Sequence, residues 1–378
     1  MDNSLENFLE KKTLYYDKID YDVIYKSWEI LKKFIKLPYV IHIVGTNGKG
    51  TTGRFLASFL NQLKKNILHY SSPHVVKFNE RIWINGIDST DEQLEFAHHN
   101  LLEILDNQLL EKLTYFEYTT LLALYLSDGI DYLILEAGLG GEFDATNVVK
   151  NDLSIFTTID LDHQNFLGDT IKEIASTKMR SCNTQYILAK QINTEVLEVK
   201  NEILSDYKEV IYDDKIDTPK NIKTLPLYLQ DNLKLSLNVL RYLNLPIDDL
   251  KIESMEGRFQ KISKNIVVDV GHNPLAAKVI LTELKKDNNK IILIYNSYAD
   301  KDYKEVLTIL KPVIQEVQII ECDDDRIVDS KVLKNCIEDL SLNVKFFDIL
   351  NMTEDNKYLV FGSFLVVDEF LSRYKRDK

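Results

Sequence analysis

The feature that most constrains this chain is a short glycine-rich segment between an apolar run and a stretch of helical character. The segment, Gly-Thr-Asn-Gly-Lys-Gly-Thr at residues 45–51, follows the apolar residues 39–44 and precedes a helix expected over residues 52–63. Strand, glycine loop and helix in that order bind phosphate, because loop N–H groups and the helix dipole point at the anion. The pattern predicts a nucleotide site; the alternative is a glycine turn with an incidental lysine.

The spacing of this loop departs from the common nucleotide-binding pattern. That pattern has four residues between its first two glycines and a hydroxyl directly after the lysine. Here two residues separate Gly45 from Gly48, and Gly50 stands between Lys49 and Thr51. This departure narrows the range of nucleotide-binding families to which the chain can belong. The candidate nucleotide-contacting residues of the loop are Thr46, Asn47, Gly48, Lys49, Gly50 and Thr51.

Length and charge limit the classes of protein to which this chain can belong. Its 378 residues exceed one ordinary domain, so we expect two. A formal net charge of −13 argues against a nucleic-acid partner, because binding a phosphate backbone needs a broad basic surface. An anionic small substrate remains compatible with basic residues that are concentrated locally.

Hydropathy and cysteine spacing predict a soluble, cytoplasmic protein with no membrane partner. No apolar run approaches the ~18 residues of a membrane span, and the first residues are acidic and polar. Cys182, Cys322 and Cys336 lie far apart without a CxxC pair, which fits a reducing compartment and argues against a zinc or disulfide framework. We expect a monomer.

Strand-like apolar runs alternate with helix-like stretches, which predicts an α/β fold with mostly parallel sheets. Before a polar stretch at 251–264, strands are expected at 39–44, 66–70, 132–136, 153–159 and 186–189, and a helix at 116–126. After it, strands are expected at 266–270, 290–295, 317–321 and 358–361, and a helix at 275–285. We therefore expect an N-terminal P-loop ATPase-like domain over residues 1–256 and a smaller Rossmann-like domain over residues 257–378.

Polar side chains follow these strands, at the edge where open α/β sheets place their ligands. Glu136 ends one strand and opens a glycine-rich stretch at residues 137–141. A carboxylate there could hold magnesium or its water shell, and a capping role is an equal alternative. His163 follows the next strand, and a lone histidine is more often structural.

Seven segments, in order along nearly the whole chain, carry a resemblance. They are residues 45–51, 71–74 (Ser-Ser-Pro-His), 79–82 (Asn-Glu-Arg-Ile), 136–147, 161–163 (Leu-Asp-His), 257–260 (Gly-Arg-Phe-Gln) and 269–274 (Asp-Val-Gly-His-Asn-Pro). This combination resembles the folylpolyglutamate synthase and dihydrofolate synthase family of the Mur ligase superfamily. The phosphate loop and the histidine alone fit any Mur relative, whereas Ser-Pro-His, Gly-Arg-Phe-Gln and His-Asn-Pro point to the folate branch.

The resemblance implies an ATP- and magnesium-dependent ligase that joins a carboxylate to an amine. In this family the carboxylate attacks the γ-phosphate of ATP, and the amine of L-glutamate then displaces phosphate from the acyl phosphate. Such chemistry depends on positioning and charge neutralisation, which suits Lys49 and Mg²⁺. The implied substrates are dihydropteroate, reduced folates and L-glutamate, and we expect a bifunctional enzyme.

The resemblance also assigns metal ligands. Ser72, Glu136 and His163 match the family's magnesium ligands, and Thr51 would place a hydroxyl near the first metal. Oxygen ligands suit magnesium, whereas a histidine is less usual and follows from the resemblance alone.

Three lysine and histidine positions are expected to act in catalysis by resemblance: Lys49, Lys178 and His272. Lys178 matches a lysine that is carbamylated in the family, where the resulting anion helps to hold a second metal. The family's Glu-Lys-Ala-Gly is Thr-Lys-Met-Arg here, at residues 177–180, and by itself Lys178 looks like an ordinary charged helix residue. His272 would lie near the glutamate or acyl-phosphate site, with a structural turn role as the alternative.

Contacts to the nucleotide and to the pterin are expected from further matching positions. Asn232, Arg258 and Asp269 match residues that contact ATP. The positions that match the pterin site are Thr114, Tyr115, Phe116, Glu117, Phe143, Asp144 and Ala145. Aromatic rings can stack on a pterin and a carboxylate can accept its N–H groups, although Phe116 is equally well explained as core. Glu142 stands where the family commonly has arginine.

Two alternative functions remain open at this point. A Mur-type ligase of cell-wall synthesis would act on a nucleotide-linked muramyl substrate and would need a further N-terminal substrate domain, for which this chain has no room. A non-catalytic nucleotide-binding relative would bind ATP without turnover.

Overall fold

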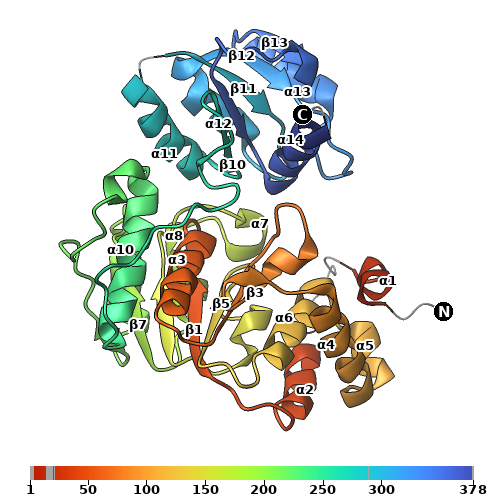
Figure 1. The fold of residues 1–378 in the computed structure, drawn as a ribbon, viewed down its shortest axis with the longest axis vertical. Coiled ribbons are helices and arrows are strands. Elements are labelled where there is room, and N and C mark those ends of the chain that lie inside the picture. Colours follow the sequence, from red (N-terminus) through yellow and green to blue (C-terminus); the bar gives the residue numbers. More distant parts are fainter. Residues whose placement is uncertain (1–3, 14–19, 21, 288, 377–378) are drawn as a thin grey trace. The chain divides into compact units, whose positions relative to one another are not determined.

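In the computed structural model, which describes residues 4–13, 20, 22–287 and 289–376, the chain divides into two units. Unit 1 comprises Met1–Ile222 and Asp231–Glu253, and unit 2 comprises Lys223–Gln230 and Ser254–Lys378. Each unit has its own sheet, as the colouring along the chain in Figure 1 shows. The prediction of an α/β protein with mostly parallel sheets is confirmed.

The sheet of unit 1 is built around the strand that leads into the glycine loop. This strand, β1 (Tyr39–Val44), pairs in parallel with β5 on one side and with β6 on the other. Among the described residues of this sheet, β3 alone runs against the others, and it pairs antiparallel with β2 and with β4 at one edge. The strand order is β4 (Ile87–Asp88), β3 (Ile82–Ile84), β2 (Ile67–Tyr70), β5 (Tyr132–Glu136), β1, β6 (Leu153–Phe156), β7 (Gln185–Leu188) and β8 (Lys208–Val210). A central position buries β1 on both sides, which explains its unbroken apolar character.

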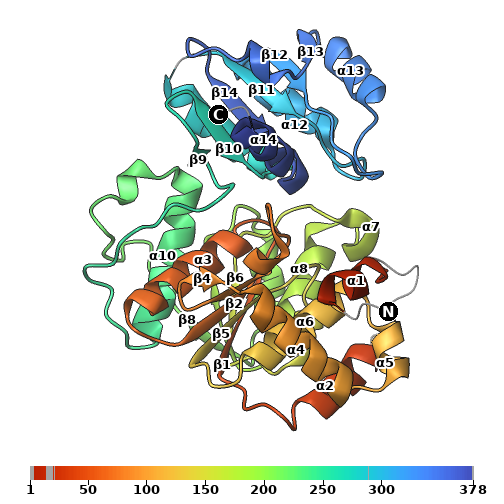
Figure 2. The ribbon, with the colours of Figure 1, turned by 45° about the vertical axis from the view of Figure 1, so that its right-hand side comes forward.

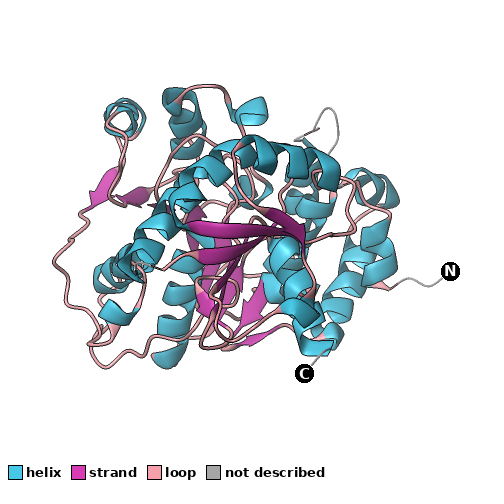
Figure 3. Ribbon diagram, turned by 90° about the horizontal axis from the view of Figure 1, so that it is seen from above, coloured by secondary structure: helices cyan, strands magenta, loops and turns pink. Residues whose placement is uncertain are grey.

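Helices pack along this sheet; Figure 3 colours the helices of the whole chain cyan and its strands magenta. Helix α3 packs against β2 and β5, and α6 packs against β2. The helices that include residues of unit 1 are α1 (Leu5–Glu10), α2 (Asp22–Leu31), α3 (Lys49–Gln62), α4 (Asp91–Ile104), α5 (Asn107–Lys112), α6 (Tyr115–Leu126), α7 (Gln164–Leu167), α8 (Ile171–Met179), α9 (Glu195–Ile203) and α10 (Leu227–Tyr242). Short 3₁₀ turns are η1 (Phe78–Arg81), η2 (Ala145–Val148) and η3 (Ile222–Thr224).

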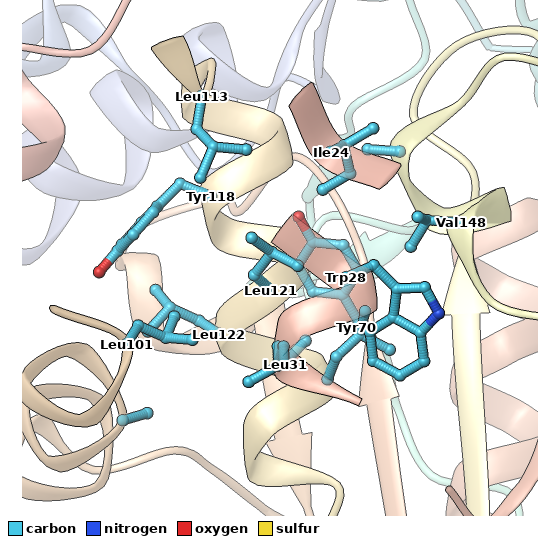
Figure 4. Packing of buried hydrophobic residues seen from close by; sticks show 14 of the residues in the cluster. Ile24, Trp28, Leu31, Tyr70, Leu101, Leu113, Tyr118, Leu121, Leu122 and Val148 are labelled. Carbon is cyan, nitrogen blue, oxygen red and sulfur yellow. The ribbon is translucent and has the colours of Figure 1, made fainter. Parts of the chain in front are cut away.

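One hydrophobic core of unit 1 lies where α2, α4 and α6 meet. Trp28 of α2 is buried beside Tyr70 of β2 and Val148 of η2, as Figure 4 shows. Helix α6 is apolar nearly all round, so it is buried on most of its surface, whereas α2 is amphipathic and turns one face inward. Tyr118 enters the same core, and its hydroxyl group pairs with Nδ1 of His98 at 2.6 Å.

Unit 2 is a smaller parallel sheet with helices packed on it. Its strand order is β13 (Val344–Phe346), β12 (Ile314–Ile319), β11 (Ile291–Tyr295), β14 (Tyr358–Phe361), β10 (Ile266–Asp269) and β9 (Gln260–Lys261). Within the described part of this unit, β9 is the one strand that pairs antiparallel with its neighbour, β10. The helices are α11 (Pro274–Leu284), α12 (Tyr303–Leu310), α13 (Ser330–Asp339) and α14 (Phe364–Arg376), with 3₁₀ turns η4 (Lys285–Asp287), η5 (Lys311–Val313) and η6 (Ile349–Asn351). In Figure 2, α14 lies over β14, against which it packs.

Most predicted elements are present, with shifted ends. Helix α3 begins at Lys49 rather than at residue 52, so the lysine belongs to the first helical turn. Strand β6 ends at Phe156 rather than at residue 159, because the backbone there leaves the sheet to hydrogen-bond with the glycine loop. Within the described part of the chain, no helix is long and apolar enough to cross a membrane.

The contact between α3 and β2 leads to a stability prediction. Gly53 lies so close to the buried His69 that a Cβ atom would collide with Nε2 of the ring. Gly53→Ala should therefore lower the free energy of unfolding by about 1–3 kcal/mol, although alanine in a helix normally adds about 0.5–1 kcal/mol. Urea titration would measure both effects. In the double variant Gly53→Ala/His69→Ala the loss should be smaller than the sum of the single losses; strict additivity would contradict this explanation.

Candidate active site

The glycine loop is shaped by two glycines that leave no room for a side chain. Gly48 has a φ of +89°, a conformation that side-chain-bearing residues rarely adopt, and a Cβ there would come within 2.6 Å of Oδ1 of Asn232. Asn232 in turn donates from Nδ2 to Oγ1 of Thr51 at 2.6 Å. Asn232, expected among the nucleotide residues, therefore lies against the loop, as that expectation requires.

The loop is also held at its start by the neighbouring strand end. Thr46 donates its backbone N–H to the carbonyl oxygen of Thr158 at 2.9 Å, and its hydroxyl donates to the carbonyl oxygen of Asp160 at 2.9 Å. A Cβ on Gly45 would collide with the side chain of Thr157. These contacts fix the backbone from which Asn47 and Gly48 project, so the curvature of the loop does not depend on a ligand.

Two lysine ammonium groups converge on one carbonyl oxygen at the start of this loop. Nζ of Lys49 and Nζ of Lys178 each lie 3.1 Å from the carbonyl oxygen of Gly45. Lys178, in the last turn of α8, is buried, and its pKa is lowered to about 7, first by desolvation and then by the charge of Lys49. Asp162 and Asp144 oppose this shift. The site concentrates positive charge that an anion would stabilise.

The expected metal ligands are partly brought together. Glu136 ends β5 and is buried beside β1, and its Oε2 accepts the backbone N–H of Ser72 at 3.3 Å. The hydroxyl group of Thr51 is buried and donates to the carbonyl oxygen of Gly48 at 3.1 Å. Hydroxyl and carboxylate oxygens are the donors that magnesium prefers, so Thr51, Ser72 and Glu136 fit that ion.

The backbone of His163 adopts the left-handed conformation, which is uncommon for a residue other than glycine. It has a φ of +52° and precedes α7, and its N–H donates to Oδ1 of Asp162 at 2.9 Å. Across the residues that the structure describes, no group of three or more His, Cys, Asp or Glu side chains is arranged to hold a metal. A magnesium ion commonly keeps several waters and binds through few protein oxygens, so this finding is compatible with the predicted site.

The expected pterin residues fall into different environments. Thr114 and Glu117 form a capping box on α6: Oε2 of Glu117 accepts both the N–H and the hydroxyl of Thr114 at 2.8 Å. Burial raises the pKa of Glu117. The pair thus has a clear structural role, and its contact with substrate stays a prediction.

The aromatic residues of this group are not all core. Phe116 is partly buried, its ring centroid is 5.9 Å from that of Tyr70, and a Cβ on Gly138 would lie 2.7 Å from the ring. Phe143 is 55% exposed. Asp144 and Ala145 are buried at the start of η2.

Sequence reasoning gave no role to an arginine that the structure places among these aromatic rings. Arg81 is buried, its Nε donates to Nδ1 of His74 at 2.8 Å, and its guanidinium group lies 5.4 Å from the ring centre of Tyr115 and 5.9 Å from that of Phe78. Desolvation and the Arg81 charge lower the pKa of His74 to about 4. The Ser-Pro-His and Asn-Glu-Arg segments stand out in the sequence, but their patterns did not predict that His74 and Arg81 are hydrogen-bonded to each other.

In unit 2 the expected nucleotide residues are organised by one carboxylate. Asp269, buried at the end of β10, accepts hydrogen bonds from Oη of Tyr228 at 2.7 Å and from the N–H groups of Phe259 at 2.9 Å and Gly271 at 2.8 Å. Burial raises its pKa, and the Tyr228 bond and the Arg258 charge oppose the shift. Asp269 therefore shapes the turn that carries Arg258, whose guanidinium group lies 5.0 Å from the ring centre of Phe364.

The His-Asn-Pro segment begins helix α11. Oδ1 of Asn273 accepts the N–H of Ala276 at 2.9 Å, and Pro274 occupies the first helical turn. Nδ1 of His272 lies 3.2 Å from the carbonyl oxygen of Val270. Asn273 and Pro274 thus act as a helix start, and the catalytic role of His272 stays a prediction.

Comparison with known proteins decides the family. The Mur ligase, glutamate ligase domain family matches residues 257–357. The dihydrofolate synthase/folylpolyglutamate synthase of Haemophilus influenzae is 31% identical over 96% of this chain and 95% of its own length. The chain belongs to the dihydrofolate synthase/folylpolyglutamate synthase family. The resemblance inferred from the seven sequence segments is confirmed.

Solved structures of family members match over nearly the whole chain. The Helicobacter pylori folylpolyglutamate synthetase has a TM-score of 0.78 and 38% identity, and the match covers 99% of this chain and 98% of that one. A bifunctional folylpolyglutamate synthase/dihydrofolate synthase with Mn, AMPPNP and L-glutamate bound has a TM-score of 0.84 and 25% identity, covering 98% and 97%.

The buried amine of Lys178 leads to a pH prediction. In CO₂-free buffer, Lys178→Met should raise the free energy of unfolding most below about pH 7, where the wild type must charge a buried amine. Between about 7 and 10.5 the unfolded chain binds more protons than the folded one, so the wild type gains stability as pH rises and the advantage of the variant shrinks. Denaturant titrations across this window measure it, with Lys172→Met on the exposed face of α8 as control. An advantage independent of pH would contradict the prediction.

Proposed function

We propose that this chain is an ATP-dependent ligase that joins L-glutamate to the carboxylate of dihydropteroate and to that of reduced folates. The observation that carries the proposal is the pair of ammonium groups of Lys49 and Lys178 on the Gly45 carbonyl, at the start of the phosphate loop of a chain in this family. A carboxylate is a poor electrophile, so amide formation needs phosphoryl transfer first. That step requires stabilisation of the negative charge on the phosphate oxygens, which the N–H groups of the loop and Lys49 would supply.

Each part of the loop has a separate task in this proposal. The N–H groups of residues 46–50 and the N-terminus of α3 receive the phosphates, and Lys49 leaves its loop carbonyls to neutralise charge on the outer phosphate. Thr51, Ser72, Glu136 and His163 would hold magnesium. When bound, magnesium would neutralise negative charge that develops on the phosphate oxygens. The substrate carboxylate attacks the γ-phosphorus and releases ADP, which gives the acyl phosphate. The glutamate amine then attacks the acyl carbon, phosphate leaves as the C–O bond breaks, and the nitrogen loses a proton to give the amide.

Lys178 is proposed to act as a carbamate. Its pKa of about 7 means that much of the amine is neutral at physiological pH, and only the neutral amine can attack CO₂. The new N–C bond forms as one C–O π bond opens, and the nitrogen releases a proton. The product is an anion beside Lys49, which removes the repulsion between two cations that share the Gly45 carbonyl. Such an anion could hold a second magnesium ion.

The remaining assignments rest on matching positions. We propose that Asn232, Arg258 and Asp269 serve the nucleotide, that His272 serves the glutamate or acyl phosphate, and that the group Thr114–Glu117 with Phe143–Ala145 serves the pterin. We also propose residues 1–256 as the ATP-binding domain and residues 257–378 as the glutamate-ligase domain. The enzyme would act as a cytoplasmic monomer.

The proposal predicts phosphate release from ATP and magnesium that depends on L-glutamate and on a pterin substrate. Dihydropteroate and tetrahydrofolate are compared with no pterin. Lys49→Ala should lower kcat about 10²–10³-fold, because a preorganised charge on the transferring phosphoryl group is lost. Release with both pterins supports the bifunctional assignment, and release with one supports a single activity. ATP binding without pterin-dependent release would favour a non-catalytic relative.

The carbamate predicts a dependence of activity on dissolved CO₂. Protein freed of bicarbonate should lose activity and regain it when bicarbonate is added, and native mass spectrometry should find the added carboxylate in the wild type but not in Lys178→Met. Lys172→Met, on the same helix, should behave as the wild type does. Full activity in CO₂-free buffer would contradict the carbamate while leaving the ligase function intact.

A further inference from the structure

We propose that His42 is a positioning residue for the pterin side of this site: through Thr146 it fixes the Asp144 carboxylate and, with it, the glycine-rich loop at residues 138–141. The inference rests on the proposed function, because its consequence is measured as substrate affinity. His42 lies in the middle of β1 and faces η2, so nothing in its sequence position indicates a role beyond the core.

Hydrogen bonds connect three side chains in series. Nε2 of His42 lies 2.8 Å from Oγ1 of Thr146, and that hydroxyl lies 2.5 Å from Oδ1 of Asp144. Oδ1 also accepts the backbone N–H of Thr146 at 2.9 Å. Oδ2 accepts the N–H of Leu139, inside the glycine-rich loop, at 2.7 Å. All three side chains are buried, with His42 at 0% exposure.

The positions of the protons in the hydrogen bonds between His42, Thr146 and Asp144 can be assigned. Burial raises the pKa of Asp144, and the Thr146 hydroxyl and backbone N–H groups oppose that shift. Because backbone N–H groups donate to both of its oxygens and an ionised carboxyl only accepts, these bonds favour the carboxylate over the acid. The Thr146 hydroxyl then donates to Asp144, so it can only accept from His42. His42 is therefore the neutral tautomer with its proton on Nε2. Burial lowers the pKa of His42 to about 3, which keeps the ring neutral.

The opposite assignment is more costly. If Asp144 were protonated and Thr146 donated to His42, the proton of the neutral ring would sit on Nδ1. That atom is buried and has no hydrogen-bond partner among the residues that the structure describes. A buried donor without a partner is rarer and more costly than a buried acceptor without one. The hydrogen bonds therefore run with His42 donating to Thr146 and Thr146 donating to Asp144.

The glycine-rich loop at residues 138–141, which these hydrogen bonds hold, lies against Phe116 and Lys178. A Cβ on Gly138 would lie 2.7 Å from the Phe116 ring, and a Cβ on Gly141 would lie 2.9 Å from the backbone oxygen of Lys178. The loop backbone therefore packs so closely against both residues that a side chain at Gly138 or Gly141 would not fit. If Asp144 moves, the Leu139 N–H loses its acceptor, and the surface beside Phe116 and Phe143 is no longer held in one arrangement.

A matched control exists on the adjacent region of the same sheet. His69 of β2 is also 0% exposed, but neither of its ring nitrogens has a hydrogen-bond partner within the described part of the chain. If buried histidines served only as core volume, His42→Leu and His69→Leu would have the same consequences. If His42 positions Asp144, only the first substitution should change substrate affinity.

The experiment compares steady-state constants and nucleotide affinity across a small set of variants. His42→Leu is expected to raise KM for dihydropteroate about tenfold, the effect of one lost buried hydrogen bond, with little change in kcat or in the Kd of an ATP analogue. Thr146→Val, which removes the hydroxyl at constant volume, should do the same. His42→Gln, which keeps an N–H donor, should restore a KM near the wild-type value, and His69→Leu should leave KM unchanged.

Ring-nitrogen NMR of the wild type supplies a second readout, because it distinguishes a proton on Nε2 from one on Nδ1. Equal KM values for His42→Leu and His69→Leu, or a proton on Nδ1 of His42, would overturn the inference while turnover by the wild type leaves the proposed function standing. Should His42→Leu fail to fold, the ring-nitrogen NMR of the wild type decides, because Thr146→Val breaks the bond to Asp144 directly. A wild type without pterin-dependent turnover would overturn the proposed function, and this inference with it.

Discussion

Two positively charged side chains share one backbone oxygen, and much of the site depends on that arrangement. The Gly45 carbonyl accepts from both Lys49 and Lys178, although two cations at this distance repel each other and one of them is buried. The structure tolerates this because the pKa of Lys178 is lowered to about 7, so that its amine can be neutral. The same repulsion favours the carbamate proposed for Lys178, which would leave Lys49 as the cation at the start of the loop.

The scaffold keeps these charges in place with close packing rather than with salt bridges. Gly45, Gly48 and Gly141 each occupy a position where a Cβ would come too close to a neighbour, namely Thr157, Asn232 and the backbone of Lys178. Strand β1 is paired on both sides, so the loop leaves the sheet from its most constrained strand. A rigid loop can hold like charges near each other, because it does not relax to separate them.

The sequence predicted the α/β class, the glycine loop and the family, because these depend on local patterns of glycine, apolar runs and short motifs. It did not predict that Glu117 pairs with Thr114 in a helix cap, that Arg81 lies over Tyr115, or that Asp269 shapes the turn of Arg258. The Arg81 and Asp269 contacts join segments that apolar periodicity does not pair. The Thr114–Glu117 cap, by contrast, has the local spacing of a capping box and could have been predicted from the sequence. His42 is the clearest case, since in sequence it is one polar residue in an apolar strand.

The acyl phosphate is the central chemical claim, and transfer of an oxygen label tests it most directly. Dihydropteroate labelled with heavy oxygen in its carboxylate is turned over with ATP, magnesium and L-glutamate, and the released phosphate is analysed by mass spectrometry. We predict one labelled oxygen atom in each phosphate, because the carboxylate oxygen that attacks the γ-phosphate leaves with it. Unlabelled phosphate formed alongside the amide would contradict activation through an acyl phosphate.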